Sequence, residues 1–247
     1  MSFDYSNSAD CIRADLVEAH RRAWEHVAAP GTWLAGAERV AVAEETRRAR
    51  ECALCAERRA TLSVGAVAGE HSASGVLCAA LVEVVHRLTT DAARLTRAWH
   101  DALIEAGLAE ERYVEALGVA ALVISVDEFH LALGLALESL PAPEPGEPTR
   151  VRPEGLVEGE AWVPMIGSGG AELLGVDGVP QARRARLPNV VRGLSLVPAE
   201  VRAWLDLSSA QYLSPAGMRR FESGRALDRS QIELVAGRVS ALNECFY

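Results

Sequence analysis

Apolar residues recur three and four positions apart along most of this chain, which is the spacing of one face of an α-helix. Short alternating apolar and polar runs, which would indicate β-strands, are rare. The pattern therefore predicts an all-α protein. The predicted helices span 8–29, 32–59 with a bend near Glu51, 74–88, 91–106, 110–137, 198–212 and 228–243.

Two helix starts carry recognisable capping residues. Asp228 is the expected N-cap of the last helix, and Gln231 three positions later completes a capping box. Thr90 is the expected cap of the helix over 91–106. In the last helix, Ile232 and the apolar positions that follow it at helical spacing predict one buried face; the others are Val235, Val239 and Leu242.

A proline-rich stretch divides the chain. Four prolines alternate with other residues from Pro141 to Pro148, and such a segment stays extended because proline cannot occupy a helix interior. This predicts an N-terminal helical domain over 1–140, a linker over 141–160 and a C-terminal helical domain over 161–247. The apolar middle of the helix over 110–137 predicts a central core helix or an oligomer seam.

The composition excludes several classes of function. A formal net charge of −9 argues against nucleic acid or anionic lipid as the main partner. All 25 basic residues are arginine, which excludes Schiff-base chemistry and a P-loop lysine. No apolar run reaches the ~18 residues of a membrane span, and the first residues lack a signal-peptide pattern, so we expect a cytoplasmic protein.

The strongest local candidate for chemistry is Cys52-Ala-Leu-Cys55. The chain has five cysteines, an odd number that does not suggest a disulfide scaffold. At a helix N-terminus, the positive end of the dipole lowers a thiol pKa, and the thiolate is the reactive form. The pair therefore predicts reversible disulfide chemistry, with the two sulfur atoms close together near the start of a helix or at a bend. Five neighbouring arginines would help to hold a thiolate: Arg47, Arg48, Arg50, Arg58 and Arg59.

Other interpretations of this pair stay open. A structural zinc site needs four ligands, and the sequence offers no second Cys-x-x-Cys and no His-x-His motif to supply them. The cysteine pair with the distant His71 is a weaker metal-site hypothesis, and two ordinary helix cysteines are another. We predict no metal ligands and no cofactor. In the segment before the pair, Glu44–Arg48 is expected to be an exposed ion pair.

The C-terminal stretch resembles the alkylhydroperoxidase D / carboxymuconolactone decarboxylase family, closest to its alkylhydroperoxidase-related selenoprotein group. That family carries a Glu, eleven residues, Cys-x-x-Cys or Cys-x-x-selenocysteine, and then a His. Glu233 and Cys245 match the Glu and the first Cys as they stand. The N-terminal pair matches less fully, because Val40 stands at the acid position and Arg59 at the His position.

This resemblance implies two alkylhydroperoxidase-like helical units and a thiol- or selenol-dependent peroxidase. The second chalcogen attacks the peroxide, and the first Cys resolves the product. Glu233 would then be the proton relay, on the inward side of the last helix, and Cys245 the resolving thiol, with Cys52 and Cys55 as a second dithiol. At that dithiol the relay candidates are Glu44, Glu51 and His71. The implied partners are a peroxide, an external dithiol reductant and further copies of the chain.

The sequence ends at Tyr247, before the second chalcogen of the C-terminal motif. We expect the C-terminal unit to be incomplete, with a UGA selenocysteine codon read as stop, and the present chain to be inactive at that motif. The alternative function is a non-catalytic helical scaffold or oligomerisation protein that has lost the chemistry. A cofactor-free lactone decarboxylase is disfavoured, because those relatives lack the cysteine pair.

Overall fold

The described part of the chain is mostly helical, with one small antiparallel pair of strands. The computed structural model describes residues 3–6, 8, 11–167, 170, 174, 188–214, 217–219, 225–243 and 245. Its α-helices are α1 (Ala14–Ala28), α2 (Gly36–Ala49), α3 (Ala53–Ala60), α4 (Ala79–Asp91), α5 (Arg97–Glu105), α6 (Glu110–Ala132), α8 (Asn189–Arg192), α9 (Pro198–Gln211) and α10 (Arg229–Leu242). The strands β1 (Leu156–Val157) and β2 (Met165–Ile166) pair antiparallel, and the 3₁₀ turns are η1 (Val64–Ala66), η2 (Ala92–Arg94) and η3 (Gly217–Arg219).

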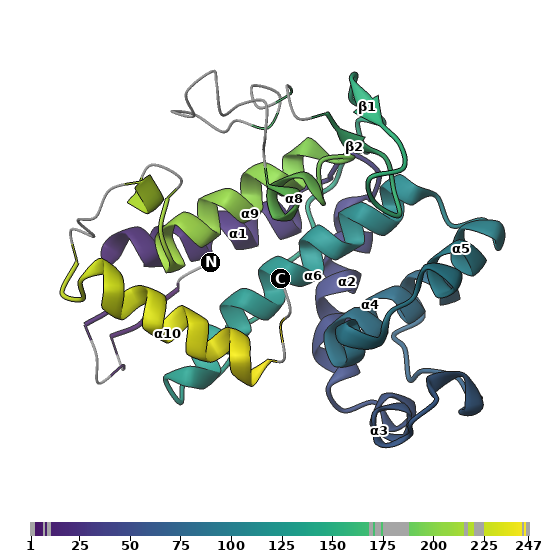
Figure 1. Ribbon diagram of the computed structural model, residues 1–247, viewed down its shortest axis with the longest axis horizontal. Helices are drawn as coiled ribbons and strands as arrows, with labels where there is room; N and C mark the ends of the chain where they lie inside the picture. The colour runs from purple at the N-terminus through teal and green to yellow at the C-terminus, as the bar shows by residue number, and fades with distance from the viewer. Residues whose placement is uncertain are drawn as a thin grey trace.

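Helix α6 is the centre of the molecule, with α1, α2, α4 and α9 packed around it (Figure 1). Its side chains enter two core clusters: Val119 and Val123 pack on the α2–α4 side, and Leu122 and Val126 on the α1–α9 side. An amphipathic helix would bury one stripe, but α6 is apolar on most of its circumference and is therefore covered on most sides. The predicted central core helix is confirmed, although it ends at Ala132 and not at 137.

The long helix predicted over 32–59 is divided into α2 and α3. Cys52 has extended backbone angles (φ −71°, ψ 120°) and is the N-cap of α3, so the chain turns here instead of only bending near Glu51. The predicted cap at Thr90 is wrong, because α4 continues to Asp91. The cap of α5 is instead Thr96, whose side chain accepts a hydrogen bond from the backbone N–H of Trp99.

The proline-rich stretch is extended, as predicted, but it is bonded to the rest of the chain. The backbone N–H of Glu144 donates to the carbonyl of Ala28, and that of Arg150 donates to Thr32. Beyond it, α9 lies beside α1 (Figure 1), and Leu196 and Val197 belong to the same core as α2, α4 and α6. The division into two units joined by a linker stays a prediction.

Helix α10 begins with the predicted capping box, in which Asp228 and Gln231 exchange hydrogen bonds. The prediction that its apolar face is buried is wrong for most of that face. Ile232 is buried, but the remaining apolar side chains are exposed by half or more: Leu234, Val235, Val239 and Leu242. This face has no covering element in the described part of the chain.

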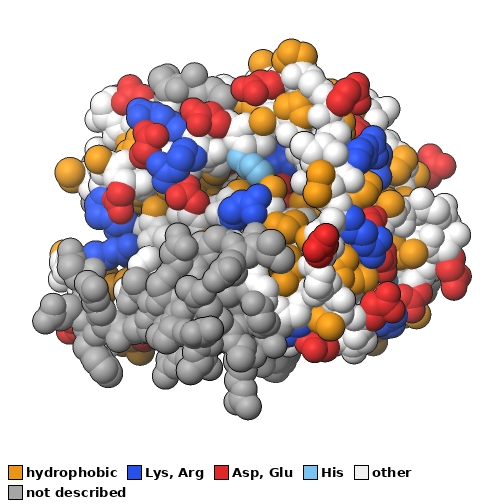
Figure 2. Space-filling model, turned by 90° about the horizontal axis from the view of Figure 1, so that it is seen from above, with side chains coloured by type: hydrophobic (Ala, Val, Ile, Leu, Met, Phe, Trp, Pro, Cys, Tyr) orange, Lys and Arg blue, Asp and Glu red, His pale blue; other side chains and the backbone are white. Residues whose placement is uncertain are grey.

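Among the described residues, no helix is long and apolar enough to cross a membrane. The face seen in Figure 2 carries acidic and basic side chains close to one another, with apolar side chains between them. Such a mixture gives no extended field of one sign on this face, in contrast to the basic stripe typical of nucleic-acid-binding proteins.

Candidate functional site

The two cysteines of Cys52-Ala-Leu-Cys55 lie at the start of α3, as predicted. Cys52 is the N-cap and Cys55 lies in the first turn, so both sulfur atoms are on the same side of the helix. Each residue is only 2% exposed. On one side they contact a small apolar cluster with Leu54 and Val67, and on the other they face polar groups.

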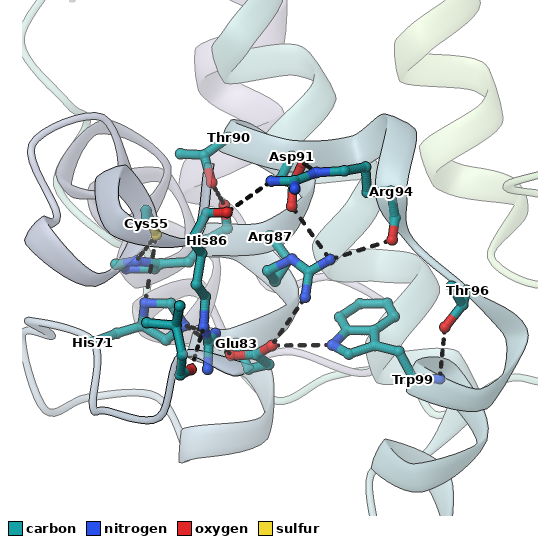
Figure 3. Close-up of polar contacts among 12 residues, drawn as sticks. Cys55, His71, Glu83, His86, Arg87, Thr90, Asp91, Arg94, Thr96 and Trp99 are labelled. Atoms are coloured by element: carbon teal, nitrogen blue, oxygen red, sulfur yellow. Dashed lines mark hydrogen bonds and ion pairs between the residues drawn. The ribbon is translucent and has the colours of Figure 1, made fainter. Parts of the chain in front are cut away.

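Two imidazoles face the sulfur atoms. The Nδ1 atom of His71, in the loop before α4, lies 3.5 Å from the sulfur of Cys52 and 3.5 Å from that of Cys55. The Nδ1 atom of His86, on α4, lies 3.4 Å from the sulfur of Cys55 (Figure 3). The ring centroids are 4.3 Å apart, and all four donor atoms lie within 4.8 Å of one another.

Each imidazole is held by a carboxylate on its far side. His71 Nε2 lies 2.8 Å from Glu83 Oε2, and His86 Nε2 lies 2.9 Å from Glu45 Oε2. A carboxylate accepts hydrogen bonds only, so in both rings Nε2 carries a proton and Nδ1 faces sulfur. The cluster therefore consists of two thiols and two carboxylate-bound imidazoles.

The carboxylates are themselves fixed. Glu83 accepts hydrogen bonds from the indole N–H of Trp99 at 3.0 Å and from the guanidinium of Arg58 at 2.9 Å. Glu45 is fully buried and accepts a hydrogen bond from the backbone N–H of Ser74 at 2.6 Å. Both ring orientations are thus determined by contacts made by α2, α4, α5 and the loop before α4.

The hydrogen bonds of the cluster favour thiolates. Burial raises the pKa of Cys52, but backbone N–H groups of Cys55 and Ser72 and the ring of His71 outweigh it, and the pKa is lowered to about 5. Burial also raises the pKa of Cys55, and hydrogen bonds from His71 and His86 again lower it below its usual value.

The pKa values of the neighbouring imidazole and carboxylate shift in the directions that favour imidazolium and carboxylate beside the thiolates. Burial lowers the pKa of His71, but hydrogen bonds to Cys55, Glu83 and Cys52 raise it to about 10. Burial raises the pKa of Glu83, whereas His71, Trp99 and Arg58 lower it to about 2. The arrangement can therefore hold negative charge on sulfur beside positive charge on imidazole.

A surface pocket of about 620 Å³ reaches the cluster from one side. Its wall includes His71 and Glu83 together with apolar side chains such as Leu77, Val82 and Leu103, but it does not include either cysteine. A small molecule in this pocket would meet the His71–Glu83 pair first. The sulfur atoms lie behind that pair.

The structure brings together only some of the residues selected from the sequence. His71, one of three relay candidates, contacts both sulfurs, whereas Glu44 forms the predicted exposed ion pair with Arg48. Glu51 is exposed. Of the five arginines expected to stabilise a thiolate, Arg58 contacts His71, and Arg48 lies 3.8 Å from the carboxylate of Glu45 as well as pairing with Glu44. Arg47 and Arg50 pair with carboxylates elsewhere, and Arg59 is exposed.

The C-terminal candidates do not form a site in the described part of the chain. Glu233 lies on the exposed side of α10 and pairs with Arg229, so the expected inward orientation is wrong. Ile232 is the buried residue at this level of the helix. Cys245 is exposed, and the remainder of its motif, Phe246-Tyr247, lies outside the described residues.

Sequence reasoning missed His86, Glu45 and Glu83. His86 lies within the buried stripe of α4, next to Val85, and Glu83 precedes it by three positions on the same helix. A histidine inside an apolar stripe was the available signal. Nothing in the sequence indicated that this stripe would face Cys55, because the two residues are 31 positions apart.

No family model matches this chain, and comparison with curated proteins and with solved structures finds no match either. Fold and site together define a helical protein with a buried cluster of two thiols and two imidazoles.

Proposed function

We propose that this protein is a thiol-dependent, peroxidase-like oxidoreductase whose reacting pair is Cys52 and Cys55. The observation that carries the proposal is the shared contact of both sulfur atoms with His71 Nδ1, at 3.5 Å each. Two thiols that share one imidazole can exchange a proton with it while a disulfide forms between them. The carboxylates behind the rings stabilise the protonated imidazoles.

The chemistry assigns different roles to the two sulfur atoms. Cys55 contacts both imidazoles, so its thiolate is the better-supported nucleophile. It attacks the O–O bond of a hydroperoxide and becomes a sulfenic acid, and the leaving alkoxide takes a proton and departs as an alcohol. Cys52 then attacks the sulfenic sulfur, a water molecule leaves, and a disulfide results. An external dithiol restores both thiols by exchange.

The two imidazole–carboxylate pairs supply the protons for these steps. The His71–Glu83 pair faces the pocket and is the natural donor to the departing alkoxide. The His86–Glu45 pair is fully buried and orients the Cys55 sulfur. The apolar walls of the pocket suit an organic hydroperoxide. Because each cysteine is 2% exposed, local opening of the loop that carries His71 is part of each turnover.

The resemblance to the alkylhydroperoxidase D-like family is part of this proposal. It implies two helical units, joined here by the proline-rich linker, together with a cytoplasmic location, assembly into homo-oligomers and a resolving role for Cys245. The exposed apolar face of α10 suits such assembly. Glu233 is left out of the proposed chemistry, because it lies on the solvent side of α10 and pairs with Arg229.

The test is peroxide consumption by metal-free protein with a dithiol reductant. The unchanged chain should consume an alkyl hydroperoxide, and Cys55→Ser should abolish this. Cys78→Ser should not, because Cys78 is an exposed thiol outside the cluster. Mass spectrometry after one equivalent of peroxide should find a Cys52–Cys55 disulfide. Equal rates in the unchanged chain and Cys55→Ser would rule out the proposal.

A non-catalytic helical scaffold is the second candidate, and one observation favours it. Both cysteines are almost completely buried, whereas peroxide-reducing thiols need solvent access. For such a scaffold, neither Cys52 nor Cys55 would react faster with a small alkylating probe at neutral pH than the exposed thiols do. Cys11 and Cys78 serve as the internal comparison, since both are exposed.

A further inference from the structure

The segment that carries the dithiol has little hydrophobic core of its own. Between α2 and α4, the buried apolar residues in mutual contact are Cys52, Leu54, Cys55 and Val67. Most other positions from 56 to 76 are exposed or half-buried. A region with so small a core needs a cross-link, and in proteins this is commonly a disulfide or a structural metal ion. The four side chains at its centre have the composition of a metal site.

We propose that Cys52, Cys55, His71 and His86 bind a single zinc ion that fastens α3 and the following loop to α4. The four donor atoms are two sulfurs and two nitrogens, a set that zinc prefers and that forms closed tetrahedral structural sites. All four lie within 4.8 Å of one another. This inference goes beyond the proposed redox function and does not depend on it.

The distances between the donors fit a tetrahedron around zinc. With Zn–S of about 2.3 Å and Zn–N of about 2.0–2.1 Å, tetrahedral angles place sulfur and nitrogen about 3.5 Å apart. The three S···N distances given for the cluster are 3.5, 3.5 and 3.4 Å. Three of the sulfur–nitrogen edges that such a tetrahedron requires are therefore already present in the cluster.

The orientation of both imidazoles supports the same conclusion. Each ring directs Nδ1 at the sulfurs and gives its Nε2 proton to a carboxylate, Glu83 or Glu45. Metal-bound histidines characteristically donate their second N–H to a carboxylate in this way, which fixes the tautomer and leaves the other nitrogen free to coordinate. The two cysteines lie at the start of α3, whereas His86 lies on α4 and His71 in the loop before it. The ion would therefore join α3 to α4.

The charges balance around the ion. Binding releases to solvent the protons that the metal-free cluster holds on sulfur or on Nδ1, and the two thiolates neutralise Zn²⁺. Of the outer carboxylates, Glu83 pairs with Arg58, and Glu45 lies 3.8 Å from Arg48. With four protein donors the ion has no open position, so its role is structural and not catalytic.

Zinc binding and disulfide formation would exclude each other. A hydroperoxide that oxidises the zinc-bound pair forms the S–S bond, consumes two protons and yields an alcohol and water, while Zn²⁺ leaves because both thiolates are lost. The metal therefore keeps the dithiol reduced. Oxidation of the zinc-loaded chain should be slower than oxidation of the metal-free chain.

The direct test is the metal content of the full chain. Elemental analysis of protein purified without chelator should give about one zinc per chain. Replacement by Co²⁺ should give thiolate-to-cobalt charge-transfer absorption and the intense visible bands of tetrahedral coordination. Removal of the metal should lower the unfolding temperature. Substoichiometric zinc, or a cobalt spectrum of octahedral type without thiolate bands, would overturn the proposal.

Variants assign the ligands. Cys52→Ser should lose zinc, and Glu45→Gln, which changes charge but hardly changes shape, should weaken zinc affinity about 10- to 100-fold by competition with a chromophoric chelator. Glu105→Gln is the matched control, because this carboxylate lies at an exposed position on α5 and binds neither imidazole. If Cys52→Ser fails to fold, Glu45→Gln still decides the question, since equal affinities of both Gln variants would contradict the site.

The two proposals can fail separately. If the protein binds no zinc but the metal-free chain forms a Cys52–Cys55 disulfide with peroxide, the zinc site is wrong and the oxidoreductase remains. If zinc binds with the expected spectrum but the metal-free chain never forms that disulfide, the site is structural and the redox proposal is wrong.

Discussion

The Nδ1 atom of His86 lies 3.4 Å from the sulfur of Cys55, although the two residues are 31 positions apart in the chain. This contact joins the start of α3 to the middle of α4. It explains why α4 carries a fully buried histidine, because the ring occupies the space between a thiol and the carboxylate of Glu45.

Glu83→Gln should slow disulfide formation in the metal-free chain. The carboxylate accepts hydrogen bonds from His71, Arg58 and Trp99, and its charge stabilises the imidazolium beside the sulfurs. Loss of that charge should decrease the rate constant for peroxide-driven disulfide formation about tenfold or more. Stopped-flow measurement after addition of a hydroperoxide checks this. Glu105→Gln, at an exposed position on α5, should leave the rate unchanged.

Gly118→Ala should destabilise the protein even though alanine is the better helix former. A Cβ atom at Gly118 would lie 2.6 Å from the Cβ of Glu200, so α6 and α9 could not keep their present distance. We expect a loss of about 1–3 kcal/mol in the free energy of unfolding, measured by urea denaturation.

Gly237→Ala is the matched control for that substitution. Its added Cβ would meet no atom within 4 Å, and the residue lies on the exposed surface of α10. Helix propensity alone should then increase stability by about 0.5–1 kcal/mol. If both glycine variants changed stability in the same direction, the close packing of α6 on α9 would not be the cause.

Arg39→Leu should be strongly destabilising. Arg39 is fully buried and its guanidinium pairs with Glu115 at 2.5 Å and with Glu200 at 2.8 Å. Burial raises the pKa of Glu200, but the charges of Arg39 and His26 outweigh it and lower the pKa to about 2. Removal of the guanidinium leaves two buried carboxylates facing each other, which should cost about 3–5 kcal/mol of unfolding free energy.

An exposed ion pair provides the comparison for Arg39. Arg22 pairs with Asp206 at 2.8 Å, but both side chains are more than 40% exposed. Arg22→Ala should therefore change stability by less than about 1 kcal/mol. Chemical denaturation of the two variants side by side measures the difference, and equal losses would show that burial of the Arg39 network does not matter.

Low pH should decrease the free energy of unfolding by protonating His20, which is buried on α1. Burial lowers the pKa of His20 to about 4, and the nearby His130 acts in the same direction. Tyr5 and Gln211 contact its two ring nitrogens, so the neutral ring is enclosed. The unfolded chain binds a proton near pH 6.5, whereas the folded chain does not until about pH 4.

The contribution of His20 to stability is therefore present above pH 6.5 and is lost as the pH falls toward 4, by up to about 3 kcal/mol. Urea denaturation at several pH values should show this slope, and His20→Gln should reduce it. An unchanged slope in the variant would assign the acid sensitivity to other groups.

The sequence by itself determined the elements that depend on near neighbours. Helical spacing identified the main helices, and the Asp228–Gln231 capping box was correct because both residues lie in one turn. The Cys52–Cys55 pair at a helix start was predictable for the same reason. Hydrogen bonds within one turn of a helix depend on neighbouring residues and not on how the other elements pack.

Only the tertiary structure decided the partners of those elements. His86 reaches Cys55 from α4, and the imidazoles are bound by Glu83 from α4 and by Glu45 from α2. No local pattern specifies which stripe of α4 faces α3. The orientation of Glu233 on α10 was mispredicted for a related reason. Periodicity shows that a helix has an apolar face, but only the packing of other elements determines whether that face is covered.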